Sequence, residues 1–196
     1  MRIISGKFRG KKLADSDHLL GLRPTTDRNR EALFNILSSG KVTKEANFKI
    51  LDSQILDICC GSGSVGFECL SRGAKSAFFI DDNHIHLDLA KQNAETLGFK
   101  ENCQFLLSDV MDFVTQGQTK FDLVFIDPPY AEDYQKIIIN LNDKQWLNPK
   151  SLIVCEFKTG QESQLDNIEF LNKLDSRKYG KTTFVFYQLK KLPKKN

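Results

Sequence analysis

Residues 54–66 read QILDICCGSGSVG, and this stretch decides the fold. A short apolar run leads directly into glycines at 61, 63 and 66, which have the G-x-G-x-x-G spacing. That spacing lets a backbone approach a ligand closely at the start of a helix. A strand, a glycine turn and a helix are therefore predicted here, with a small-molecule site at the turn.

Short apolar runs like the first recur along the chain. Stretches with helical character separate them, namely VGFECLSRG, NHIHLDLAKQNAETLG and EDYQKIIINLNDK. Strands buried on both faces and separated by helices predict a doubly wound, parallel α/β sheet. The run KTTFVFYQLKK (181–191) alternates like an edge or antiparallel strand. The predicted parallel strands are QILDICC (54–60), SAFFID (76–81), CQFLLSD (103–109), FDLVFID (121–127) and SLIVCEF (151–157).

The first forty residues have a different character. RIISGKFRGKKL alternates around two glycines and predicts a basic hairpin or arm. RPTTDRNREALFNIL then predicts a helix that Thr26 or Asp27 could cap. We therefore expect an arm and first helix over residues 1–40, and a catalytic domain over residues 41–196.

Charge is divided unevenly along the chain. The net charge is +3, but residues 1–30 carry +5, residues 173–196 carry +7 and the middle carries −9. Basic ends around an acidic centre favour a surface that meets phosphates. Lysine-rich ends that merely aid solubility are the alternative.

Cysteine and histidine usage gives no metal site. Five cysteines without a C-x-x-C pair predict reduced, mostly buried thiols and a cytoplasmic protein. His84 and His86 are two apart with His18 far off, which predicts surface or helix-start histidines. No apolar run reaches membrane-spanning length and the basic start lacks a secretory core, so we expect no membrane association.

Asp57 helps to decide which ligand the glycine turn takes, because the turn alone is compatible with NAD, FAD or S-adenosylmethionine. A carboxylate before the glycines would repel a pyrophosphate. It suits the ammonium and nearby sulfonium of S-adenosylmethionine, directly or through water. A carboxylate that caps the turn's own amides is the structural alternative, and both roles can hold together.

Acids also follow the next two strands. Asp81 ends the second strand, where doubly wound folds place an acid for ribose hydroxyls, and it is a better choice than Asp82 for a bidentate contact. Ser108 and Asp109 end the third strand, and Asp109 could accept from an adenine amino group. A helix cap ahead of Val110 is the equally weighted alternative for Asp109.

The fourth strand ends in Asp127-Pro128-Pro129-Tyr130, the most specific feature of the sequence. Two prolines fix the backbone and remove competing amides, so the Asp127 carboxylate and the Pro128 carbonyl can both accept from one NH2 group. Two such acceptors draw the nitrogen lone pair out of ring conjugation. Tyr130 offers a face on which an extruded base can stack. A plain turn is the alternative.

These segments together resemble the RsmD family of 16S ribosomal RNA guanine-N2 methyltransferases, over nearly the whole chain. The RPT-x-x-x-x-R-E pattern distinguishes this resemblance from amino methyltransferases in general. Two departures are Asp81, where Glu is common, and Cys60, where alanine is common. The similar segments are RIISGKFRGKKL (2–13), GLRPTTDRNREALFNIL (21–37), LDICCGSGSVGFECLSRGA (56–74) and VFIDPPY (124–130).

The resemblance implies a Rossmann-like class I fold, with a seven-stranded, mostly parallel sheet that has one antiparallel strand. It implies S-adenosylmethionine as cofactor, and as substrate the N2 amine of guanine 966 of 16S ribosomal RNA in a 30S particle, bound by a monomer. We assign the cofactor to Asp57, Cys59, Gly61, Ser62, Gly63, Asp81, Asp82, Ser108, Asp109 and Asp127, catalysis to Asp127, Pro128, Pro129 and Tyr130, and RNA to Arg9, Lys11, Lys12, Arg23, Thr25, Arg28 and Arg30.

Other functions fit parts of the pattern. Adenine N6 of DNA or a protein glutamine could occupy the same corner, but no DNA-recognition domain is visible. An NAD-dependent oxidoreductase explains the glycines and leaves the Asp-Pro-Pro-Tyr corner idle. A non-catalytic RNA-binding factor leaves the acids without a role.

Overall fold

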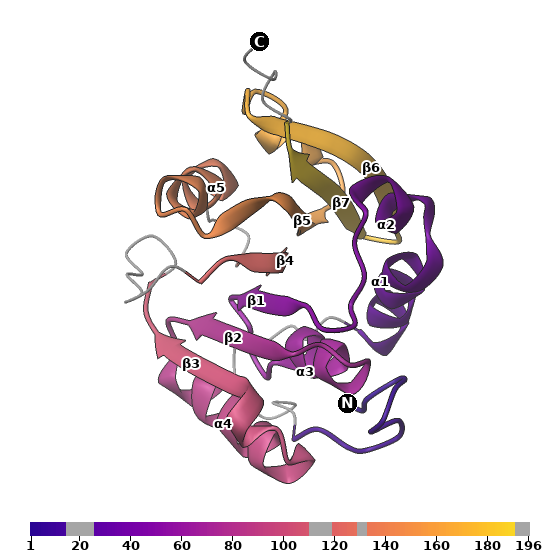
Figure 1. The fold of residues 1–196 in the computed structure, drawn as a ribbon, viewed down its shortest axis with the longest axis vertical. Coiled ribbons are helices and arrows are strands. Elements are labelled where there is room, and N and C mark those ends of the chain that lie inside the picture. The colour runs from indigo at the N-terminus through magenta and orange to yellow at the C-terminus, as the bar shows by residue number, and fades with distance from the viewer. Residues whose placement is uncertain (15–25, 110–118, 129–132, 191–196) are drawn as a thin grey trace.

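A seven-stranded sheet forms the centre of the molecule, as the computed structural model describes it over residues 1–14, 26–109, 119–128 and 133–190 (Figure 1). The strand order is β3-β2-β1-β4-β5-β7-β6. The first five strands along the chain pair in parallel, and β7 is antiparallel to both of its neighbours. The strands are β1 (Gln54–Ile58), β2 (Ser76–Asp81), β3 (Cys103–Leu107), β4 (Phe121–Ile126), β5 (Leu147–Lys158), β6 (Leu171–Tyr179) and β7 (Thr182–Leu189).

Helices cover both faces of this sheet. Alternate residues of a strand point to opposite faces, and they divide the core into two clusters. One cluster joins Ile55, Phe79 and Phe125 of the strands to the arm and four helices, whereas the other joins Leu56 and Val124 to α5. The helices of the first face are α1 (Asp27–Ser39), α2 (Lys41–Ala46), α3 (Ser64–Ser71) and α4 (His84–Leu97), and α5 (Tyr134–Asp143) covers the second, with 3-10 turns η1 (Lys100–Asn102) and η2 (Glu162–Leu165).

The predicted fold class is confirmed, and most predicted elements are present. β2 has the predicted bounds, and Thr26 caps α1 by accepting a hydrogen bond from the Asn29 amide at 3.2 Å. The sequence pattern did not predict the short helix α2, the edge strand β6 or the 3-10 turns η1 and η2. Within the described residues, no helix combines the length and the apolar character that crossing a bilayer requires.

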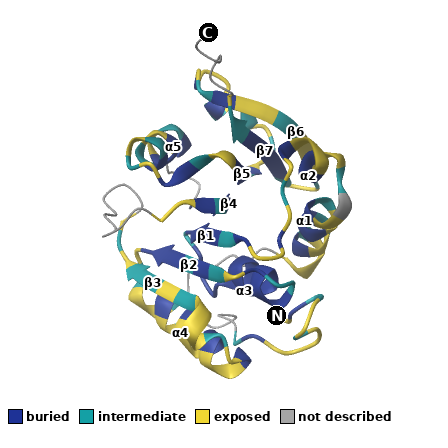
Figure 2. Cartoon of the chain, viewed as in Figure 1, coloured by how far each residue is buried: buried dark blue, intermediate teal, exposed yellow. Residues whose placement is uncertain are grey.

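The arm, residues 1–14, packs on the same core as the rest of the chain. An antiparallel bridge joins Arg2 to Lys12, and the Ile3 amide donates to the Lys11 carbonyl at 2.9 Å. Ile3 and Leu13 are buried in the α1–α4 cluster, while the outer side of the arm is exposed (Figure 2). The division at residue 40 stays a prediction about function, since both parts share one core.

Candidate active site

The predicted ligand-binding turn and the predicted amine-binding corner lie at adjacent strand ends. Strand β1 has β2 on one side and β4 on the other, so the chain order reverses at β1. Ile58 is in register with both Ile80 and Ile126, the last apolar residues of those neighbours. The Asp127 amide donates to the Ile58 carbonyl at 3.4 Å. In open α/β sheets, ligands bind at this carboxyl edge, where the strand order reverses.

The glycine turn packs tightly against the core at the carboxyl edge of the sheet. Gly63 caps α3 with a φ of 76°, a left-handed conformation that glycine adopts without a steric penalty. A Cβ at Gly63 would lie 2.6 Å from the Phe67 ring, and a Cβ at Gly66 would lie 2.4 Å from the Phe79 ring. Cys59 also has a positive φ, of 57°. The turn therefore follows a path that larger side chains would displace.

Asp57 lies beneath this turn and is almost fully buried. Its Oδ2 accepts a hydrogen bond from the Gly66 amide at 2.9 Å. Burial raises the pKa of Asp57 to about 7, the Gly66 hydrogen bond opposes that rise, and the nearby charge of Asp81 adds to it. Asp57 therefore has the structural role that the sequence left open, because it accepts a hydrogen bond from a backbone amide of the glycine segment. It is also compatible with a cationic ligand, which would favour the ionised carboxylate.

Three polar groups contact the Asp81 carboxylate at the end of β2. Its Oδ2 accepts from the Gly61 amide at 2.8 Å, and its Oδ1 accepts from the Asn83 amide at 3.0 Å. The His86 Nδ1 atom lies 3.0 Å from the same Oδ1. Sequence reasoning assigned no role to His86, because its contact depends on how α4 begins. Asp82, by contrast, is exposed.

The end of β3 lies beside Asp81. The Ser108 amide donates to the Asp81 carbonyl at 3.1 Å, and the Ser108 hydroxyl donates to the Asp109 carbonyl at 3.1 Å. Asp109 is exposed at this edge. Its contact with adenine stays a prediction, and the alternative helix cap involves residues outside the described part of the chain.

The Asp127 corner is described as far as Pro128. Asp127 is half-buried and Pro128 is buried, while Pro129 and Tyr130 lie outside the described residues. Tyr134, the first residue of α5, donates its hydroxyl to the Glu156 carbonyl, which ties α5 to β5 beside this corner. Burial raises the pKa of Tyr134, and the Asp127 charge adds to that rise.

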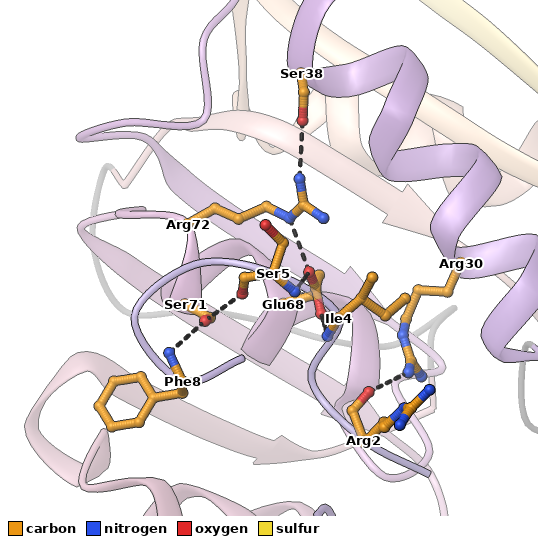
Figure 3. A network of polar contacts seen from close by, with 9 residues as sticks. All are labelled: Arg2, Ile4, Ser5, Phe8, Arg30, Ser38, Glu68, Ser71 and Arg72. Atoms are coloured by element: carbon orange, nitrogen blue, oxygen red, sulfur yellow. Dashed lines mark hydrogen bonds and ion pairs between the residues drawn. The ribbon is translucent and has the colours of Figure 1, made fainter. Parts of the chain in front are cut away.

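The arm is anchored to the helix that follows the glycine turn. Glu68 of α3 is fully buried and accepts from the Ile4 amide at 2.7 Å, the Ser5 amide at 2.9 Å and the Arg72 Nε at 2.8 Å (Figure 3). One turn later, the Ser71 hydroxyl donates to the Ser5 carbonyl at 2.6 Å. A charged residue within the otherwise apolar stretch of α3 was the available sequence signal for this contact.

A second anchor joins the end of the arm to the glycine turn itself. The Asn93 side chain of α4 exchanges two hydrogen bonds with the backbone of Ala14, at 2.7 and 3.0 Å. Its Nδ2 also donates to the Ser62 carbonyl at 3.0 Å. Asn93 falls on the apolar face of α4, beside Ala90 and Ala94, and a polar residue there is the signal that the sequence offered.

The residues predicted to contact RNA differ in exposure, and Arg30 is a separate case. Arg9, Lys11, Lys12 and Arg28 are exposed. Arg23 and Thr25 lie outside the described residues.

Arg30 differs from the exposed group, because it is fully buried. Its guanidinium donates to the Arg2 carbonyl at 2.5 Å, which joins α1 to the arm (Figure 3). It also donates to Asp27, within α1, at 2.8 Å. Burial lowers the pKa of Arg30, and the carboxylates of Asp27 and Glu68 oppose that shift. A surface contact with RNA is not open to this side chain in the observed arrangement, since its donors face the interior.

A metal centre has no ready set of ligands in the described ranges. No three histidine, cysteine or acidic side chains gather there in a way that could hold an ion.

Comparisons with known proteins show which chains this one is similar to. A family model described as "Conserved hypothetical protein 95" matches residues 1–188. Ribosomal RNA small subunit methyltransferase D of Escherichia coli is 41% identical over 80% of this chain and 74% of its own length. The Haemophilus influenzae protein of the same name is 35% identical over 96% and 93%. The solved structure of yhhF from Escherichia coli superposes with a TM-score of 0.77 at 33% identity, covering 96% of this chain and 97% of its own.

Proposed function

This chain belongs to the RsmD family of methyltransferases, and from that premise we propose that it methylates the N2 amine of a guanine in small-subunit ribosomal RNA. One observation carries the proposal: the Asp127 amide bonds to the Ile58 carbonyl, and the glycine turn begins at the next residue. A donor over the turn and an amine at Asp127 would therefore be neighbours. The position of the guanine, 966 in 16S ribosomal RNA, comes from the family resemblance.

The residues of the turn fit S-adenosylmethionine. Gly63 and Gly66 allow the turn to pack against the Phe67 and Phe79 rings, where a side chain would collide. Asp57 and Asp81 are acids of the kind that a cationic amino acid end and a ribose require. When bound, S-adenosylmethionine supplies an electrophilic methyl group on a sulfonium. The residues that would hold it are Asp57, Cys59, Gly61, Ser62, Gly63, Asp81, Asp82, Ser108 and Asp109. Asp127, which the sequence also assigned to the cofactor, would serve the amine instead.

The Asp127 corner would prepare the amine for attack. The exocyclic nitrogen of guanine is a poor nucleophile, because its lone pair is shared with the ring. The Asp127 carboxylate and the Pro128 carbonyl would accept its two hydrogens, which localises the lone pair and fixes its direction. Positioning of this kind can lower a barrier by about 7–11 kcal/mol in favourable cases. Pro129 and Tyr130 would shape the base pocket, with the base stacked on Tyr130.

The arm offers a surface for RNA phosphates. Arg9, Lys11 and Lys12 are exposed, and none of the three makes an ion pair with a described acid. The Lys11 ammonium lies 5.4 Å from the centre of the Phe8 ring, and Phe8 packs edge-on against Phe99 at 4.7 Å. Cations held on a fixed loop without a described acid partner favour phosphate contacts. We include Arg28, Arg23 and Thr25 in this RNA surface, and place the protein in the cytoplasm as a monomer acting on a 30S particle.

Two binding partners separate this proposal from its alternatives. Calorimetry should detect S-adenosylhomocysteine and give no heat with NAD, because Asp57 disfavours a pyrophosphate. If the protein binds NAD and does not bind S-adenosylhomocysteine, the NAD-dependent oxidoreductase is supported instead.

Transfer of radiolabelled methyl groups tests the substrate. Small ribosomal subunits, naked ribosomal RNA, DNA and protein are offered in parallel with labelled S-adenosylmethionine. We expect label in small-subunit RNA. Label in DNA or protein would contradict the proposed substrate, and cofactor binding without transfer to any of them would favour a non-catalytic RNA-binding factor.

A further inference from the structure

His86 contacts the acid that we assign to the cofactor ribose. It lies in the first turn of α4, and its Nδ1 is 3.0 Å from Asp81 Oδ1. The His86 side chain is only 16% exposed, and Asp81 is buried. An ionised carboxylate only accepts hydrogen bonds, so the hydrogen of this contact belongs to Nδ1. His86 is therefore a donor to Asp81, with its tautomer fixed by the contact.

Counting acceptor positions shows what this donor changes. A carboxylate offers four lone-pair positions, about two on each oxygen. Oδ1 accepts hydrogen bonds from the Asn83 amide and from His86 Nδ1, and these two bonds occupy both of its lone-pair positions. Oδ2 receives the Gly61 amide alone among described donors, so one position remains. The sequence predicted a bidentate contact of Asp81 with the ribose. The structure leaves room for a contact through Oδ2 only.

We propose that His86 is a positioning residue for cofactor binding, which fixes Asp81 so that Oδ2 receives one hydroxyl of the donor's ribose. This inference rests on the proposed function, because it takes Asp81 to be the ribose acid. The Asn83 amide and His86 both come from the start of α4, and the Gly61 amide comes from the turn. Asp81 is thus oriented by the two elements that border the site, and His86 supplies the one side-chain donor among these three contacts.

Three variants isolate the donor. His86→Leu removes it and keeps an apolar side chain in the space, whereas His86→Asn keeps an amide donor at the position that Nδ1 occupies. His84→Leu is the matched control, because His84 is exposed two residues earlier on the same helix. Thermal unfolding of each variant establishes that it folds.

The measurement is calorimetric affinity for S-adenosylhomocysteine and for its 2′-deoxy and 3′-deoxy analogues. His86→Leu should weaken the parent compound about five- to tenfold. One of the two analogues lacks the hydroxyl that Oδ2 would hold, and the affinity for that analogue should fall by less than about twofold in the same variant. His86→Asn and His84→Leu should match the wild type. Equal weakening of all three compounds by His86→Leu, or none, would overturn the proposal, as would an Asn variant as weak as the Leu variant.

Two further results keep the outcome unambiguous. If the wild-type protein binds no S-adenosylhomocysteine, the proposed function fails, whatever His86 does. Should His86→Leu not fold, nitrogen NMR of the wild-type imidazole at about pH 9, where a free imidazole is neutral, decides the donor. A hydrogen on Nδ1 is expected, and a hydrogen on Nε2 would overturn the proposal.

Discussion

Asp57 is the residue at which folding and ligand binding make opposite demands. The fold buries its carboxyl group and raises its pKa from 3.8 to about 7, mainly by desolvation. A cationic ligand would reverse that shift, because it favours the charged form. The ligand-free protein therefore contains a group that destabilises it at neutral pH and that a bound cation would stabilise.

The pH dependence of stability tests this point. The pKa of Asp57 is higher in the folded than in the unfolded protein, so burial of this group lowers the free energy of unfolding once the unfolded carboxyl ionises. The loss is absent below about pH 4, grows up to about pH 7 and is constant above that. Asp57→Asn should therefore raise the unfolding free energy of the ligand-free protein at pH 8 by up to about 4 kcal/mol. Urea unfolding at several pH values measures it. Equal stability of the two proteins at pH 8 would contradict the assigned pKa.

Asp127 should separate binding from chemistry. Asp127→Ala should change the affinity for S-adenosylhomocysteine little and lower the methyl-transfer rate about a hundredfold or more, because the amine loses an acceptor. Calorimetry and single-turnover transfer measure the two effects. Asp143→Ala, an exposed carboxylate at the end of α5, is the control. An equal loss of affinity and rate would remove Asp127 from the proposed role.

At the scale of elements, the arm depends on α3. Glu68→Gln keeps the size of the side chain but replaces an acceptor with a donor next to backbone amides. We expect a loss of about 2–4 kcal/mol in unfolding free energy, and faster hydrogen exchange at the amides of Ile4 and Ser5. Urea unfolding and exchange mass spectrometry measure these effects, with exposed Glu45→Gln as the control. Unchanged exchange in the arm would contradict the anchoring role.

Charge on the same arm should determine the salt dependence of RNA binding. Reversal of Arg9, Lys11 and Lys12 to Glu should reduce the slope of log affinity against log salt by about 0.7–0.9 for each phosphate that the arm no longer neutralises. Reversal of Lys41, Lys44 and Lys49, which are exposed outside the arm, is the control. Filter binding over a range of salt concentrations measures the slope. An unchanged slope in the arm variant would exclude the arm from the RNA surface.

Elements were predictable where their residues had one dominant environment. The parallel strands carry apolar runs because both of their faces are buried, and glycine and acid positions follow from where those runs end. β6 is an edge strand with the sequence LNKLDSRKY, whose charged residues give no apolar face to recognise. The anchors Glu68 and Asn93, and the contact of His86 with Asp81, depend on which helices meet, which spacing along the chain does not specify.

At the scale of the whole molecule, the sheet order brings the separate sequence signals together. The glycine turn and the Asp127 corner are over sixty residues apart in sequence. They become neighbours because β4 pairs with β1 on the side opposite β2. The arm is joined to the same region through Glu68 and Asn93, so the RNA surface and the cofactor turn that we propose belong to one packed unit.

The most direct measurement is nucleoside mass spectrometry of small-subunit ribosomal RNA from cells with and without the gene, combined with mapping of the modified position. We expect that one N2-methylguanosine disappears without the gene, returns with the wild-type chain and stays absent with Asp127→Ala. An unchanged set of methylated guanines, or the loss of a methyl group from a different base, would contradict the proposed function.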